Sequence, residues 1–256
     1  MSLPKVLLQI LYVLLMAALL LGVPRLAALA ADQFHYAGLD PDAAFAWLSV
    51  RHIVQGLIFL VLMLIISRVS GIRFGFGWGD RQVGWLYVRI FALVFLGYTV
   101  VSLIIIFLTR SFQGFQYPLT PRNIIGHLGF QALLTGPSEE LIFRAFAMTM
   151  LSLMISGSVV SAGSGFGRVI LKIFGSEISI VNLIAAVIFG LAHVRFTFNP
   201  FSASYSTGQV IYATMLGLIY GVSYERSGSM IYPMMMHSIS NVVAVSVSII
   251  ASLLIG

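Results

Sequence analysis

The stretch GPSEELIFR, residues 136–144, lies in the middle of an apolar tract that covers residues 123–155. It contains two adjacent acids, Glu139 and Glu140, in a chain that has only eight Asp and Glu among 256 residues. A carboxylate inside a bilayer costs roughly a few kcal/mol or more unless it has a partner. Arg144 follows Glu140 by four residues, one helical turn, so it can neutralise one of the two acids. The stretch therefore predicts a buried reactive site on a membrane-embedded helix.

The composition is that of an integral, multi-pass membrane protein. Hydrophobic residues make up 59% of the chain and charged residues 9%, and the mean hydropathy is +1.02. A soluble domain would carry roughly a quarter charged residues. The net charge of +6 is spread over the loops, so we expect membrane lipids as partners and no nucleic acid. The absence of cysteine excludes disulfides and thiolate chemistry.

Apolar stretches long enough to span a bilayer, or nearly so, predict an all-α fold of about seven or eight helices. We expect a polytopic transmembrane bundle in which the later helices form a polar cavity. No internal repeat is visible, so residues 1–256 are interpreted as a single integral-membrane domain. The predicted helices lie near residues 5–23, 44–67, 84–109, 123–155, 178–193, 208–225 and 229–255.

Two local features are expected around the long fourth stretch. Gly136 and Pro137 predict a helix break, with Ser138 as the N-cap of the helix that carries the acids. Beyond this tract, residues 157–168 are rich in Gly and Ser and predict a flexible link that gates the cavity or selects substrates. The apolar positions of residues 166–174 fall on one helical face and predict a short interfacial helix.

The amino terminus permits two interpretations. Lys5, the apolar run 6–23 and the small residues 28–30 are typical of a secretory signal, but the run is long for one. We favour a retained first span over a cleaved signal. Lys and Arg counted over alternating loops give seven on the amino-terminal side and five on the other. This predicts a multi-pass protein of the cell membrane with a cytoplasmic amino terminus.

Two further pairs of polar residues lie in the late apolar segments. His193 follows Phe189 by four residues, and Asn241 follows His237 by four. Residues four apart share one helix face. Glu, His and Asn side chains from three different helices can meet only if those helices pack together, which such costly buried groups would require. The sequence therefore predicts that they form one site with the Glu pair.

Three known kinds of intramembrane catalytic site find little support in the sequence. The chain contains neither Gly-x-Ser-Gly nor His-Glu-x-x-His. Residues 77–80 match the Gly-x-Gly-Asp of aspartyl proteases, but they lie in an Arg-bearing loop. An aspartyl dyad needs two carboxylates that share a proton, and the other aspartates also lie outside the predicted spans. We interpret this match as coincidental.

The order Glu-Glu-x-x-x-Arg, Phe-x-x-x-His and His-x-x-x-Asn resembles the three motifs of the CPBP family, also called the Abi family. That family includes CAAX prenyl endopeptidases and bacteriocin-processing or immunity proteins. The sequence of residues 189–193 and 217–229 also resembles that of typical members. The resemblance covers a motif-bearing core of about residues 123–245, whereas residues 1–122 match only as hydrophobic spans.

The resemblance implies an intramembrane endopeptidase with a cavity open to one membrane face. Its substrate would be a lipidated, CAAX-type or hydrophobic membrane-associated peptide, cut near the membrane surface. By similarity, Glu139 and His193 would hold and deprotonate the attacking water. Glu140 would pair with Arg144 and orient the first acid.

His237 and Asn241 would, by the same similarity, stabilise the tetrahedral oxyanion from the opposite wall. A metal is a separate question. Glu139, His193 and His237 form a candidate three-ligand zinc site with one open position. The same atoms serve a metal-free mechanism in which a glutamate activates water. The sequence leaves both open.

Two functions of other classes also fit the polar residues. A non-proteolytic membrane scaffold or bacteriocin-immunity protein could retain the motif residues as structural contacts. A transporter could use the intramembrane Glu and His to carry protons, although the chain has no inverted repeat. Replacing Glu139 with Gln separates the scaffold from the enzyme, because only an enzyme needs the carboxylate at that position.

Overall fold

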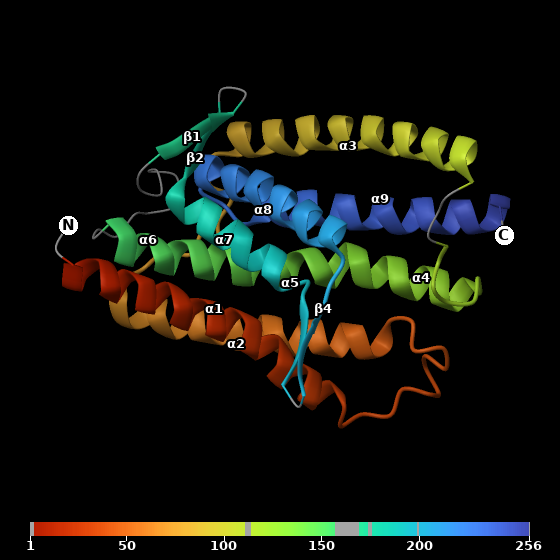
Figure 1. Cartoon of the computed structure of the whole chain (residues 1–256), viewed down its shortest axis with the longest axis horizontal. Coiled ribbons are helices and arrows are strands. Elements are labelled where there is room, and N and C mark those ends of the chain that lie inside the picture. Colours follow the sequence, from red (N-terminus) through yellow and green to blue (C-terminus); the bar gives the residue numbers. More distant parts are fainter. Residues whose placement is uncertain (1–2, 111–113, 157–168, 174–175, 199, 256) are drawn as a thin grey trace.

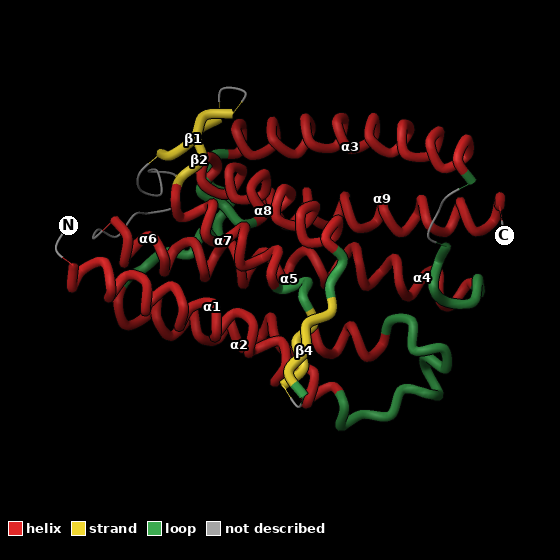
Figure 2. The backbone as a smooth tube through the Cα atoms, in the orientation of Figure 1, coloured by secondary structure: helices red, strands yellow, loops and turns green. Residues whose placement is uncertain are grey.

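The computed structural model describes residues 3–110, 114–156, 169–173, 176–198 and 200–255. Most of the chain forms long helices that run roughly along one common direction, with two small hairpins attached (Figures 1 and 2). The fold is therefore the predicted all-α bundle with two additional hairpins. Outside the central helix, the helices are α1 (Leu3–Ala31), α2 (Ala46–Ser70), α3 (Arg81–Thr109), α7 (Ile180–Leu191), α8 (Thr207–Ser227) and α9 (Ile231–Ile255).

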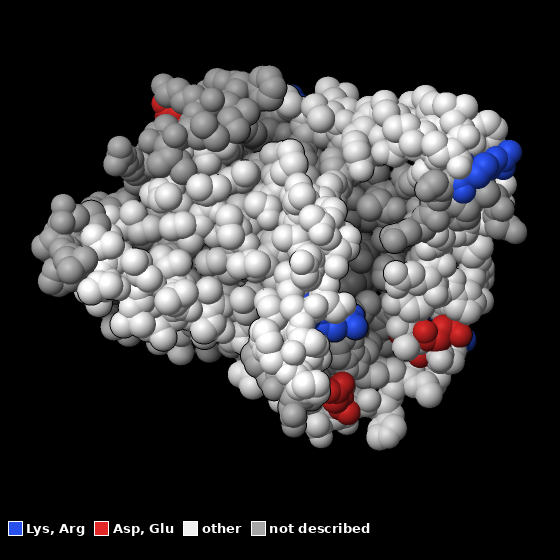
Figure 3. All heavy atoms as spheres, viewed as in Figure 1, with Lys and Arg blue, Asp and Glu red and all other residues white. Residues whose placement is uncertain are grey.

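Four helices in the described part are long and apolar enough to cross a membrane: Val6–Ala31, Ala46–Ser70, Arg81–Thr109 and Ile231–Leu254. The face shown in Figure 3 carries few charged side chains among its described residues, and most lie in the right-hand half of that view. Both findings agree with a helical membrane protein. The number of seven to eight spans stays a prediction.

The central helix is continuous where a break was predicted. Gly136 keeps right-handed helical angles, with φ −55° and ψ −56°, and the chain enters the next turn without leaving the helix. Pro137 lacks an N–H and its ring clashes with the carbonyl four residues earlier. The wider π-helical turn just before it can absorb both defects. The central helix consists of α4 (Pro121–Phe130), η1 (Gln131–Thr135), α5 (Gly136–Glu140), η2 (Leu141–Met148) and α6 (Thr149–Ser156).

The segment α5 is packed between α2 and α9. A Cβ atom on Gly136 would lie 2.6 Å from Ser238 Oγ and 2.9 Å from the Met234 carbonyl oxygen, both on α9. Only glycine therefore allows this close approach of the two backbones. The segment η2, which follows, is buried along its whole length. This packing fixes the position of the Glu pair at the centre of the molecule.

The predicted interfacial helix over residues 166–174 is wrong where the structure describes it. Val169–Ile173 is a strand, β1, paired antiparallel with β2 (Ser176–Ser179). Three of its five residues are β-branched, which favours a strand, and a helix this short is marginal by itself. The predicted link 157–168, with Phe166, and also Phe174 lie outside the described residues. A second hairpin, β3 (Arg195–Phe198) and β4 (Phe201–Ser204), joins α7 to α8.

Aspartates of the loops cap two of the long helices. Both carboxylate oxygens of Asp40 accept hydrogen bonds from the backbone amides of residues 44–46, at 2.7 to 2.8 Å, where α2 begins. Asp80 accepts one from the Val83 amide at 3.0 Å and caps α3. An acceptor at this position satisfies amides that have no partner within the helix. Asp80 therefore has a structural role, in agreement with the interpretation of residues 77–80 as coincidental.

Candidate active site

A cavity of about 420 Å³ lies between α1, α2, the α5–η2 segment and the connection from α7 to β3. Its volume is within the range of small-molecule and peptide-side-chain sites. Its apolar wall residues come from α1, η2 and the connection from α7 to β3. Its polar wall residues come from α1, α2, α5 and the connection from α7 into β3: Arg25, Arg51, His52, Gln55, Glu139, His193 and Arg195.

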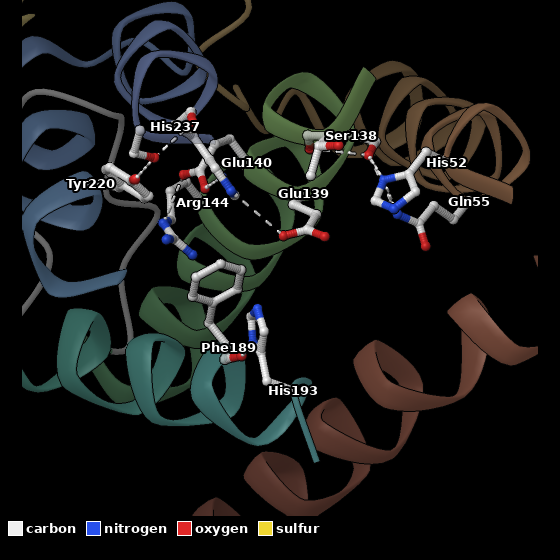
Figure 4. A network of polar contacts seen from close by, with 12 residues as sticks. His52, Gln55, Ser138, Glu139, Glu140, Arg144, Phe189, His193, Tyr220 and His237 are labelled. Carbon is white, nitrogen blue, oxygen red and sulfur yellow. Dashed lines mark hydrogen bonds and ion pairs between the residues drawn. The ribbon is translucent and has the colours of Figure 1, made fainter. Parts of the chain in front are cut away.

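Glu139 is the acid that faces this cavity. Its side chain is 20% exposed, whereas that of Glu140 is 0% exposed. In Figure 4 the Glu139 carboxylate points into the space between α2 and His193. Its Oε2 atom lies 3.8 Å from Nε2 of His237. The carboxylate is thus accessible on one side and supported on the other.

Glu140 belongs to a buried ion-pair network behind the cavity. Its Oε1 lies 2.8 Å from Nδ1 of His237, and its Oε2 lies 2.9 Å from Nε of Arg144. Because a carboxylate oxygen only accepts, His237 Nδ1 carries a proton and donates it to this bond. The Arg144 guanidinium lies 4.7 Å from the Phe189 ring centroid and 5.5 Å from that of Tyr220. Cation–π contacts therefore hold a fully buried Arg whose Nη atoms have no hydrogen-bond partner among the described residues.

The ring of His237 is fixed on its faces as well as at its nitrogens. It stacks on Tyr220 at 5.1 Å and meets the edge of Phe189 at 5.8 Å. The Tyr220 hydroxyl is in turn hydrogen-bonded to Ser240 at 2.7 Å. His237 is 5% exposed and, in the described part of the chain, does not line the cavity. It connects the two acids, one at each of its nitrogens.

His193 lies just beyond the last residue of α7 and forms part of the cavity wall. Its Nδ1 is 3.0 Å from the Phe189 carbonyl oxygen. Since that oxygen is an acceptor, Nδ1 is the protonated nitrogen, and in the neutral ring Nε2 keeps its lone pair. Figure 4 shows the ring extending toward Glu139 across the cavity. This tautomer can accept a hydrogen bond from a water molecule.

The structure brings together five of the six residues that the sequence singled out. Phe189 joins them, because its ring contacts Arg144, His193 and His237. Asn241 is different: it lies one helical turn beyond His237 on α9, half-buried, and is not among the described residues that line the cavity.

Sequence reasoning missed a polar cluster between α2 and α5. His52 Nδ1 lies 2.7 Å from Ser138 Oγ, and Gln55 Nε2 lies within 3.1 Å of that nitrogen and 3.3 Å of that hydroxyl. Ser138 is therefore no N-cap; its hydroxyl also reaches the Thr135 carbonyl oxygen at 3.3 Å. His52 and Gln55 are three apart and share one face of α2. Two polar residues so spaced in an apolar span were a signal that could have indicated a polar cluster, although not the helix it would meet.

The candidate zinc ligands do not form a metal site in the described part of the chain. No group of three or more His, Asp or Glu there is placed to hold a metal ion. The physical reason is placement: Glu139 and His193 line the cavity, whereas His237 is buried behind Glu139 and is not among the described residues of the cavity wall.

Residues 121–243 match the family described as Rce1-like, "Type II CAAX prenyl endopeptidase Rce1-like". The matched range begins at the first residue of α4, ends within α9 and contains all three motifs. No curated protein and no solved structure matches the chain. The resemblance predicted from the motifs is thereby confirmed.

Proposed function

Because this chain belongs, through its residues 121–243, to the family of type II CAAX prenyl endopeptidases, we propose that it is an intramembrane endopeptidase. It hydrolyses a peptide bond near the membrane surface in a CAAX-type lipidated or hydrophobic membrane-associated peptide. The observation that carries this proposal is the shared cavity of Glu139 and His193, which come from different elements and face each other.

Glu139 acts as the general base. It is the accessible acid of the pair and lies in a cavity that can hold water. A water between Glu139 and Nε2 of His193 would donate to both, which orients its oxygen toward the substrate carbonyl carbon. Glu139 takes the proton as the new C–O bond forms and returns it to the leaving amine as the C–N bond breaks.

The network behind Glu139 positions it. His237 presents Nε2 at 3.8 Å to Glu139 and is oriented by Glu140, which is neutralised by Arg144. Glu140 thus acts on Glu139 through His237. For the oxyanion we retain His237 and Asn241, as the resemblance implies, with His237 as the nearer group. With Nδ1 bonded to Glu140, a second proton on Nε2 would make the ring an imidazolium, which can stabilise negative charge that develops beside Glu139.

For localisation, topology and domain organisation we keep the predictions made from the sequence. We place the protein in the cell membrane with a cytoplasmic amino terminus and a retained first span, and we treat the whole chain as one integral-membrane domain. The packing of α1 supports the retained span: α1 lies against α2, and its Leu20 and Ala27 are fully buried.

Cleavage of a farnesylated CAAX reporter peptide by purified, detergent-solubilised protein tests the proposal. Glu139→Gln keeps the volume of the side chain and removes the base, so its rate should fall at least about 100-fold, as should that of His193→Ala. Arg89→Gln, an exposed site on α3, is the matched control and should retain the wild-type rate. Undiminished cleavage by Glu139→Gln would instead favour another base, and an unchanged biological effect without cleavage would favour the scaffold.

A further inference from the structure

Positive charge gathers around the cavity that contains Glu139. Arg25 from α1, Arg51 from α2 and Arg195 from β3 all form part of its wall. Glu139 is the one acid among the described wall residues. Arg51 is half-buried, whereas Arg25 and Arg195 are exposed. A half-buried cation in a cavity wall is costly without an anionic partner, so Arg51 indicates a site for a further anion.

Arg51 is the central cation of this group. Its side chain is half-buried, and its guanidinium lies 5.7 Å from the Trp47 ring centroid. Its Nε atom is buried without a hydrogen-bond partner, and Arg51 forms no ion pair within the described residues. A buried donor with no acceptor destabilises a protein, whereas an anion in the cavity would satisfy it.

The position of Arg51 relative to the reacting groups is fixed by its neighbour. His52, the next residue on α2, is hydrogen-bonded to Ser138, and Ser138 precedes Glu139. Arg25 lies on the adjacent helix α1, and its Nη2 approaches the Phe196 carbonyl oxygen of β3 at 3.5 Å. Two guanidinium groups from neighbouring helices thus face one cavity with the general base.

We propose that Arg51, assisted by Arg25, binds the terminal carboxylate of the peptide segment that is cleaved off. This inference rests on the proposed function, since a CAAX sequence ends three residues after its cysteine. Three extended residues reach only about 10 Å, so the chain end must lie in the same cavity as the scissile bond. A guanidinium fits a carboxylate with two parallel hydrogen bonds.

This arrangement makes the position of the cut depend on the distance from the C-terminal carboxylate of the substrate. Binding the carboxylate at Arg51 while Glu139 and His193 hold the water fixes the number of residues between the cut and the terminus. A substrate whose carboxylate is replaced by a neutral amide loses this contact but keeps its lipid and its scissile bond.

Two farnesylated peptides of identical sequence, one a free acid and one a C-terminal amide, test the inference. Wild-type kcat/KM should be at least about tenfold higher for the acid, because hydrogen bonds between charged groups contribute that much or more. Arg51→Gln should lose this preference by slowing cleavage of the acid alone. Arg89→Gln, which removes an exposed Arg that is not part of the cavity wall, should keep the preference.

Two results would contradict the role proposed for Arg51. Equal cleavage of acid and amide by the wild type would overturn the inference while leaving the protease intact. Equal slowing of both peptides by Arg51→Gln would show that Arg51 supports Glu139 or the fold and does not bind the terminal carboxylate of the substrate.

A binding measurement keeps the inference testable if neither peptide is cut. The probe is a tripeptide of two aliphatic residues and a C-terminal serine, as free acid and as amide. The acid should raise the Tm of the solubilised wild type, and the amide should not. Arg51→Gln should lose the Tm increase. If the free-acid tripeptide has no effect on the wild-type Tm, the inference about Arg51 is wrong, whether or not the protein proves to be a protease.

Discussion

At the scale of single residues, two neighbouring acids have opposite surroundings. Glu139 is 20% exposed and faces a cavity, whereas Glu140 is 0% exposed and lies between Arg144 and His237. Successive residues of a helix point about 100° apart, so adjacent acids cannot face the same partner. Glu139 remains accessible from the cavity, whereas Glu140 forms the ion pairs that hold His237 beside Glu139.

Replacing Arg144 with Met tests the supporting half of the pair. It leaves the Glu140 carboxylate buried without its cationic partner, which should reduce the free energy of unfolding by about 3–5 kcal/mol and abolish cleavage. Thermal denaturation and the reporter assay measure both effects. The double variant Glu140→Gln, Arg144→Met removes the uncompensated charge and should recover part of the Tm. A double variant no more stable than Arg144→Met would contradict the role assigned to the ion pair.

Replacing His52 with Ala tests the cluster that the sequence did not reveal. His52 holds Ser138, the residue before Glu139, so its loss should lower kcat on the order of tenfold through misplacement of the base. Ser138→Ala should cause a similar loss. Because both changes break one contact, His52→Ala should cost little more in the Ser138→Ala background. Independent, multiplying losses would show that His52 acts by another route.

At the scale of elements, the sequence predicted where helices form better than how they are shaped. The ion pair between Glu140 and Arg144 follows from a spacing of four and is confirmed. The break at Pro137 was wrong because a π-helical turn, which depends on packing against α9, has no local signal in the sequence. The strand β1 was missed because alternating and helical patterns are indistinguishable over five residues.

The cap of α2 predicts a pH dependence. Burial disfavours the charged form of Asp40, but the backbone amides of residues 44–46 and the charge of Arg122 outweigh it and lower its pKa below the ordinary value. A pKa lower in the folded protein than in the unfolded chain means that the charged cap stabilises above about pH 4, the ordinary pKa. This contribution is lost as the pH falls through the lowered pKa.

Thermal denaturation from pH 7 to pH 3 measures this contribution. Asp40→Asn should have a lower Tm than the wild type at pH 7, because a neutral amide is a weaker acceptor for three amides. The Tm difference should narrow as the pH falls below about 4. A Tm difference that does not depend on pH would show that the charge of Asp40 is not what stabilises the start of α2.

At the scale of the whole molecule, residues 1–120 do more than anchor the family-matched region. They supply Arg25, Arg51, His52 and Gln55 to the cavity wall, although the match begins at residue 121. The sequence could not predict this, because one polar residue in an apolar span carries no information about which helix it will meet. The motif residues were predictable because their spacing is local.

The arrangement of donors predicts independence from metal. Glu139 and His193 face the cavity while His237 is buried behind Glu139, so no three-donor set is assembled in the described part of the chain. Incubation with a strong zinc chelator should leave the cleavage rate unchanged. Loss of activity that added zinc restores would instead require His193 and Nε2 of His237 to approach Glu139 closely enough to share one ion.

The central claim is that Glu139 activates a water that cleaves the bond after the prenylated cysteine. Mass spectrometry of the products formed in ¹⁸O-labelled water tests it most directly. The wild type should release the C-terminal tripeptide and leave one ¹⁸O in the new carboxylate of the cysteine, and Glu139→Gln should give neither product. Labelled product from Glu139→Gln at the wild-type rate, or wild-type cleavage at a different bond, would contradict the account.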